Sequence, residues 1–137
     1  MCLIDNLTNG HHSNYVVLFT RVLQGLGYSV LLLYPERLDE FDSFDQEKFS
    51  FFKIKPPSPS SYRFRTIKCW AKHRNDIQKA CKASGMKPDL VYFLWADDLR
   101  FPNDHFFINA LSKLYIENFI NYSWSGLYFH PNHYRKE

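Results

Sequence analysis

Long apolar runs are missing from this 137-residue sequence. None approaches the roughly 20 residues that a transmembrane helix needs, and the first residues lack the basic start and apolar stretch of a signal peptide. These absences predict a cytoplasmic protein. The length matches one domain of about 100 to 150 residues, so we expect residues 1–137 to form a single domain.

Cysteine is scarce and odd in number. Of the three cysteines, Cys69 and Cys81 lie on one expected helix, where a rise of about 1.5 Å per residue separates them too far for a disulfide. We therefore expect three free thiols, with Cys2 as the third. Charged residues make up 23% and hydrophobic residues 45%, which is typical of a globular chain and excludes wholesale disorder.

The glycine motifs of nucleotide-binding loops are also absent. The loop after the first expected strand contains Gly10 as its single glycine, so it matches neither the dinucleotide pattern G-x-G-x-x-G nor a P-loop.

No metal site is predicted either. Asp97 and Asp98 are adjacent rather than spaced as D-x-D. A zinc site from His130 and His133 with the histidines near residue 11 would lack both a nearby cysteine and a clean set of four ligands.

Charge is unevenly distributed, although its net value is only +3. Segment 36–47 is acidic, and segment 63–87 holds eight basic residues against one acidic residue, Asp76. Since no recognised binding motif accompanies these charges, no nucleic-acid partner is predicted. Two interpretations of the basic helix face stay open: a solvated outer surface, or peripheral contact with anionic lipid at the inner membrane face. That face consists of Arg65, Lys68, Lys72, Lys79 and Lys82.

Strand and helix patterns alternate along the sequence. Apolar runs predict strands over 2–4, 28–34, 49–55 and 90–95, with the second and fourth reading as buried on both faces. Tyr15, Phe19, Val22, Leu23 and Leu26 recur at spacings of three and four, which predicts an amphipathic helix over 13–26 that stops at Gly27. A second helix is predicted over 62–84. This pattern is typical of an α/β fold, a Rossmann-like parallel sheet with helices on both faces.

The last third of the chain is less regular. A further helix starting at Asn103 or Asp104 is expected, followed by extended segments at 119–122 and 127–129 around a turn at 123–126. No closing helix follows. We therefore expect an incomplete domain, either cut short or completed by a partner chain.

In open α/β sheets, ligands bind at the carboxyl ends of the strands. Two segments of this chain fit that position, 5–13 after the first strand and 95–99 after the strand that begins at Leu90. The first of them ends at a helix N-terminus, which favours an anion or a sugar hydroxyl.

Three phrases carry a resemblance to a known family. The run 9–15 (Asn-Gly-His-His-Ser-Asn-Tyr), with the helix end 23–30, resembles the opening of GT-B glycosyltransferases. Lys87-Pro88-Asp89 and the strand after it resemble the entry to a later strand of the same domain, and 124–131 resembles a phrase of bacterial members. The resemblance implies the amino-terminal, acceptor-side domain of an enzyme that transfers sugar from a nucleotide-sugar donor to an acceptor hydroxyl.

What this resemblance implies about the site can be stated by residue. His12 is the expected general base, because histidine suits proton transfer near neutral pH. The acceptor, a sugar or a lipid-linked molecule, is expected to contact Asn9, Gly10, His11, Tyr15, Trp95, Asp97 and Asp98. No cofactor is implied, and the donor would be held by a second domain whose paired glutamates are not found here.

Other interpretations remain open for the same residues. His11 and His12 can be a solvent-facing pair in a polar loop, Trp95 a core residue, and Asp97 with Asp98 a solvated turn. For the whole chain, the alternative is a non-catalytic Rossmann-like module that docks to a partner. Without the donor domain, the expectation is a chain that is inactive alone.

Overall fold

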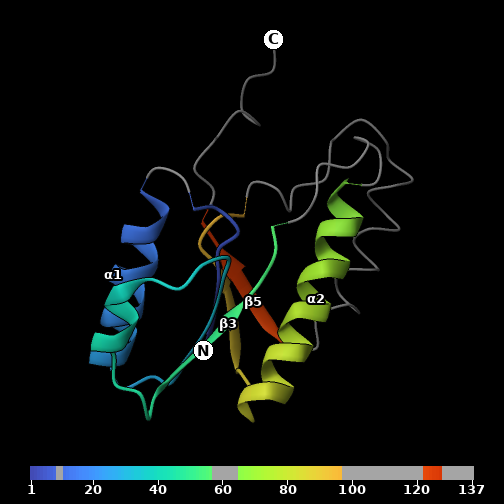
Figure 1. The fold of residues 1–137 in the computed structure, drawn as a ribbon. Coiled ribbons are helices and arrows are strands. Elements are labelled where there is room, and N and C mark those ends of the chain that lie inside the picture. The colour runs from blue at the N-terminus through green and yellow to red at the C-terminus, as the bar shows by residue number, and fades with distance from the viewer. Residues whose placement is uncertain (9–10, 57–64, 97–121, 128–137) are drawn as a thin grey trace.

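The computed structural model describes residues 1–8, 11–56, 65–96 and 122–127. These residues form one five-stranded, all-parallel sheet in the order β3-β2-β1-β4-β5. Its strands are β1 (Cys2–Ile4), β2 (Val30–Tyr34), β3 (Phe49–Lys53), β4 (Leu90–Phe93) and β5 (Ser123–Gly126). Helix α1 (His12–Gly25) and the short helix η1 (Asp39–Ser43) lie on one face of the sheet and α2 (Arg65–Ser84) on the other (Figure 1). The predicted α/β class is confirmed, and the strand order is that of doubly wound folds.

Strand β1 is central and is paired on both edges. Cys2 lies opposite Leu31 of β2 and Val91 of β4, and the register continues to Ile4. Successive side chains of a strand point to opposite faces. Leu3 accordingly packs on the α1 side, and Cys2 and Ile4 pack on the α2 side.

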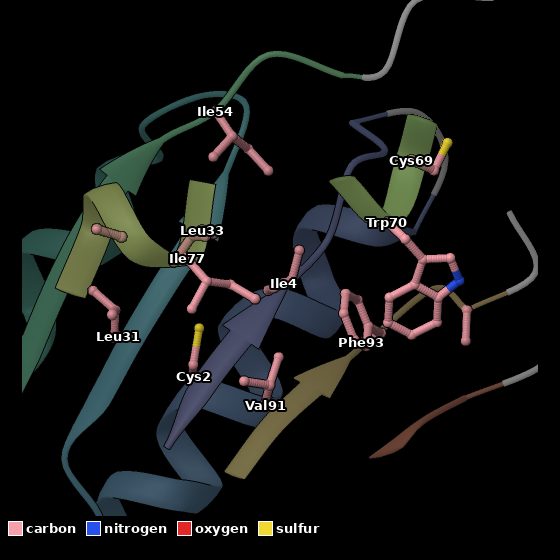
Figure 2. Packing of buried hydrophobic residues seen from close by; sticks show 12 residues of the cluster. Cys2, Ile4, Leu31, Leu33, Ile54, Cys69, Trp70, Ile77, Val91 and Phe93 are labelled. Carbon is pink, nitrogen blue, oxygen red and sulfur yellow. The ribbon is translucent and has the colours of Figure 1, made fainter. Parts of the chain in front are cut away.

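The core on the α2 side is built from that helix and the three central strands. Figure 2 shows Ile77 of α2 directed at Ile4 and Trp70 directed at Phe93. The rings of Trp70 and Phe93 meet edge to face with centroids 5.7 Å apart. Each large apolar side chain buried this completely contributes about 1.5–3 kcal/mol. This layer therefore fixes α2 on the sheet.

Helix α1 forms where it is predicted, but its buried face differs from the one that the spacing suggests. Gly27 has a φ of +88° and ends the helix, as expected. Val16 and Thr20 are buried, whereas Val22 and Leu26 are exposed. Apolar residues occur on nearly every side of this helix, so periodicity alone does not determine which side meets the sheet.

Strand β5 corrects the expectation of a turn at 123–126. The segment pairs in parallel with β4 over its whole length. Trp124 packs against Trp70 with centroids 5.0 Å apart, and Leu127 N–H donates to the Phe93 carbonyl at 3.0 Å. Tertiary contacts thus override a sequence of serine and glycine that favours a turn. The expected helix from residue 103, and the segments 119–121 and 128–129, lie outside the described residues.

The outer face of α2 carries exposed lysines as predicted, at Lys68, Lys79 and Lys82. Lys72 differs, because it is largely buried and forms an ion pair with Asp76 one turn away. All three cysteines are thiols rather than halves of a disulfide, which confirms that expectation. None of the helices in the described part of the chain combines the length and apolar character needed to cross a membrane.

Candidate functional site

The centre of the sheet is where the chain reverses direction. From β1 the chain proceeds through β2 to β3 on one side and then crosses to β4 and β5 on the other. In open α/β sheets, ligands bind at such a switch point, beyond the carboxyl ends of the two strands that flank it. The two segments that the sequence marks as binding loops follow these two strands, β1 and β4. The described residues next to these two strand ends, 5–8 and 94–96, therefore start from neighbouring strands.

His12 and Trp95 come together across this switch point. His12 is the first residue of α1, and Trp95 lies two residues beyond the end of β4. Their ring centroids are 5.0 Å apart at an interplanar angle of 71°. Trp95 is partly exposed. It is thus one wall of the site rather than a fully buried core residue.

Asp5 holds His12 in place. The Nδ1 atom of His12 lies 2.8 Å from Oδ2 of Asp5, whose side chain is fully buried. The other carboxylate oxygen of Asp5 accepts the Leu7 N–H at 3.0 Å. Both oxygens are therefore engaged, and the carboxylate is fixed between the end of β1 and the start of α1.

Ionisation of Asp5 is energetically unfavourable in this buried position. Burial raises the pKa of Asp5 above its usual value, and the hydrogen bonds from Leu7 and His12 only partly oppose this effect. The adjacent β2 residue Tyr34 is buried too, and burial together with the Asp5 charge raises its pKa to about 12. The site therefore places a buried carboxylate beside a phenol that stays neutral.

The Asp5 contact determines how His12 can react. A carboxylate that accepts the Nδ1 proton leaves Nε2 as the basic nitrogen of the neutral ring. No described residue hydrogen-bonds Nε2 of His12. The His12 side chain retains 13% of its exposure, so it can be reached from solvent. A histidine oriented in this way can accept a proton at Nε2 from a bound hydroxyl group.

A second polar contact lies on the opposite face of the same strand end. Asn6 follows Asp5 and points to the other side, where its Nδ2 lies 3.1 Å from Nε2 of His73 on α2. His73 is fully buried, and its ring meets Phe93 edge to face. The two adjacent residues at the end of β1 are thereby tied to a helix on each face of the sheet.

His73 is held in the neutral form. Burial, with a smaller contribution from the charge of Lys72, lowers the pKa of His73 to about 3. Because the Asn6 amide donates, Nε2 of His73 accepts and Nδ1 carries the proton. Within the described residues, neither that Nδ1 nor Oδ1 of Asn6 has a hydrogen-bond partner. Two buried polar atoms of this pair are thus unsatisfied.

Of the remaining predicted site residues, two lie in the described part of the chain and four do not. His11 is exposed, occupies the N-cap of α1 and makes no capping hydrogen bond with its side chain. Tyr15 is one turn into α1 and also exposed. Asn9, Gly10, Asp97 and Asp98 lie outside the described residues, as do His130 and His133. Among the residues that are described, no group of three potential ligands can hold a metal ion.

The sequence prediction covers Asp5 and Asn6 only as part of the binding loop 5–13, and it does not include His73. Asp5 had a usable signal, since it is a carboxylate at the end of a buried strand just before a histidine-containing loop. His73 had a weaker one, because it shares a helix face with Trp70 and Ile77 at spacings of three and four. Asn6 had no such signal in the sequence.

Comparison with known proteins identifies no relative of this chain. No protein-family model, curated protein or solved structure matches the chain. Functional inference therefore depends on the geometry and on the resemblance carried by the sequence phrases.

Proposed function

We propose that this chain is the acceptor-side domain of a GT-B type glycosyltransferase and that His12 is its general base. The observation that carries the proposal is the buried Asp5–His12 hydrogen bond at the switch point of the sheet. A carboxylate that orients a histidine through Nδ1 serves enzymes that must deprotonate a hydroxyl group. The glycine- and histidine-containing loop phrase at 9–15 supplies the class of reaction.

The proposed chemical step assigns each group one role. Nε2 of His12 accepts the proton of the acceptor hydroxyl, and Asp5 stabilises the imidazolium that forms. The acceptor oxygen then forms a bond to the anomeric carbon of the donor sugar. The bond from that carbon to the nucleotide phosphate breaks, and the phosphate leaves with the electron pair. In this proposal the donor is held by a second domain, and Trp95 borders the acceptor, since indole rings stack well on sugar faces.

Binding by the isolated chain tests the proposal. We expect acceptor molecules to shift the NMR signals of the His12 ring and the Trp95 indole, whereas nucleotide sugars at equal concentration shift neither. A suitable panel contains simple glycosides, phenols and short-chain lipid alcohols beside two nucleotide sugars. His12→Gln should lose the acceptor response, and His11→Gln, which changes an exposed neighbour, should keep it. Failure of every acceptor to shift these signals, or a response to nucleotide sugars alone, contradicts the proposal.

Asp5→Asn provides a second arm of this test. Because burial raises the Asp5 pKa, the protonated carboxyl group favours folding below its unfolded pKa, and that contribution is lost as pH rises through the folded pKa. Replacing it with a neutral amide should therefore leave the chain folded at pH 7. The 15N shifts of the His12 ring should nevertheless change, since an amide no longer fixes the proton on Nδ1. Unchanged ring shifts would show that Asp5 does not orient His12.

Catalysis by the chain alone is not expected under this proposal. Purified protein should neither transfer nor hydrolyse a nucleotide sugar above a heat-denatured control. Turnover above that control would contradict the assignment to the acceptor side.

A further inference from the structure

An exposed row of apolar side chains runs along α1. Leu18, Val22 and Leu26 recur every four residues and are 55%, 51% and 69% exposed. This spacing puts them on one side of the helix. Tyr15, three residues before Leu18, extends the row at the start of the helix and is exposed as well. We call Leu18, Val22 and Leu26 the α1 stripe.

A groove adjoins the α1 stripe along the same helix. It measures about 430 Å³ and lies between α1 and the segment that leads into η1. Leu18 belongs to both the stripe and the groove, and the exposed Arg21 of α1 also lines the groove. Leu38 and Glu40 form the opposite wall. At the other end of α1, Gln24 exchanges hydrogen bonds with the backbone of Asp45. Segment 36–47 therefore follows α1 for most of its length, as Figure 1 also shows.

That segment gives the groove a negative border. It contains six acidic residues and one basic residue, Arg37. Arg37 pairs with Asp42, and Asp45 lies 3.8 Å from Lys48. Four exposed carboxylates form no ion pair with any described residue: Glu36, Asp39, Glu40 and Glu47. An apolar stripe with a border of unpaired acidic groups is complementary to an apolar surface flanked by cations.

The exposed lysines of α2 do not share this surface. They belong to the helix on the other face of the sheet (Figure 1). A helix that rests on anionic lipid combines apolar and basic residues on one surface. Here the two features are separated. Segment 36–47 has six acidic residues against Arg37 and the Arg21 that lines the groove, so the net charge beside the α1 stripe is negative and has the wrong sign for such a membrane. A second copy of the chain would bring the same acidic border.

We propose that the α1 stripe and its groove dock an amphipathic helix of a partner protein, with lysine or arginine along the flank that faces segment 36–47. Binding of this kind uses apolar anchors on one helix face at spacings of three and four. The partner's anchors contact Leu18 and Val22, and its cations face Glu40 and its neighbours.

A pair of synthetic helices tests the docking surface. One 18-residue peptide carries leucine on one face and lysine on the other, and its counterpart carries glutamate in place of lysine. Affinity is measured by fluorescence anisotropy with the full chain at about 0.15 M salt, where the Debye length is about 8 Å. We expect the lysine peptide to bind at least tenfold more tightly than the glutamate peptide.

Variants separate the apolar and the charged contributions. The double variant Leu18→Ser, Val22→Ser leaves every charge in place and should lower the affinity for the lysine peptide at least tenfold. Glu40→Lys leaves the α1 stripe in place and should lower the affinity for the lysine peptide by a smaller factor. Lys79→Ser on the exposed face of α2 is the matched control and should bind as the wild type does. Circular dichroism and urea unfolding confirm that each variant is folded.

Each other outcome overturns the proposal. Unchanged binding by the double serine variant shows that the α1 stripe takes no part. Equal binding of the two peptides shows that the acidic border does not select the partner. A wild-type dimer that the double variant converts to a monomer assigns the surface to a second copy. Binding to neutral phosphatidylcholine vesicles that the same variant abolishes assigns it to lipid.

Discussion

Asp5 and Asn6 show how two adjacent residues can serve opposite faces of a sheet. Asp5 contacts His12 of α1, and Asn6 contacts His73 of α2. The alternation of side chains along a strand makes this division unavoidable once both residues are buried. The two contacts differ in accessibility, because the His12 side chain keeps 13% of its exposure whereas His73 is fully buried and stays neutral. Of these two histidines, only His12 can thus be reached from solvent.

The buried histidine has a measurable effect on stability. His73 has a folded pKa of about 3, and an unfolded histidine titrates near about 6.5. Between these values the unfolded chain binds more protons, so the free energy of unfolding falls as pH decreases, by about 1.4 kcal/mol per pH unit at most. His73→Gln removes this titration and should flatten the dependence between pH 6.5 and pH 4.

Urea unfolding at several pH values measures this difference. Comparison of the variant with the wild type cancels the other titrating groups, including Asp5. His11→Gln is the matched control, because His11 is exposed, and it should keep the wild-type slope. If the free energy of unfolding depends on pH with the same slope in the wild type and in His73→Gln, His73 is not kept neutral by burial.

At the level of elements, β5 depends on one glycine. A Cβ atom on Gly126 would lie 2.9 Å from both the Ala96 Cβ and the Phe93 carbonyl oxygen. Backbone atoms cannot move away as easily as the end of a long side chain, so Gly126→Ala should destabilise the fold by about 1–3 kcal/mol. Gly25→Ala is the control, because no atom lies within 4 Å of its Cβ position. It should be neutral or stabilising by up to about 1 kcal/mol, since alanine favours helix.

Thermal and urea unfolding of the two alanine variants tests this difference. A Gly126→Ala protein as stable as the wild type would mean that β5 does not approach β4 as closely as described.

The elements also show what a sequence can and cannot predict. Strands β2 and β4 were predictable because a strand buried on both faces must be apolar throughout. Strand β5 was not, because Ser123 and Ser125 are exposed and Trp124 is held by a residue on a distant helix. The helix α1 was predictable, but its orientation was not, since apolar residues surround it.

The candidate site was predictable to a similar degree. The loops at the ends of β1 and β4 follow from the α/β pattern, and with them His12 and Trp95. The Asp5–His12 contact depends on how the chain between them turns back, which a spacing of seven residues does not fix. The Asn6–His73 contact joins residues 67 positions apart and is a product of tertiary packing.

For the whole molecule, charge is divided between the two sides of the sheet. Because the exposed lysines of α2 lie apart from the α1 stripe, attraction to a membrane through α2 would be electrostatic alone, at about 1 kcal/mol for each basic residue near the surface. We expect weak binding to vesicles that contain anionic lipid, and release as salt rises, since the Debye length is about 10 Å at 0.1 M.

Vesicle sedimentation with two triple variants tests this expectation. Changing Lys68, Lys79 and Lys82 to Glu should abolish binding. Changing Lys48, Lys53 and Lys55 to Glu alters the net charge equally at exposed positions outside α2, and it should preserve most of the binding. Equal loss in both variants, or binding that persists at high salt, would contradict a role for the α2 face.

The central position of β1 has a consequence for synthesis of the chain. Its three residues pair with β2, which emerges soon afterwards, and with β4, which emerges some 60 residues after β2. At about 5–20 residues per second, that interval lasts roughly 3–12 s. Until it ends, one edge of an apolar strand has unpaired N–H and C=O groups, which favour association with other chains. Slow translation between residues 35 and 93 should therefore increase aggregation of nascent chains.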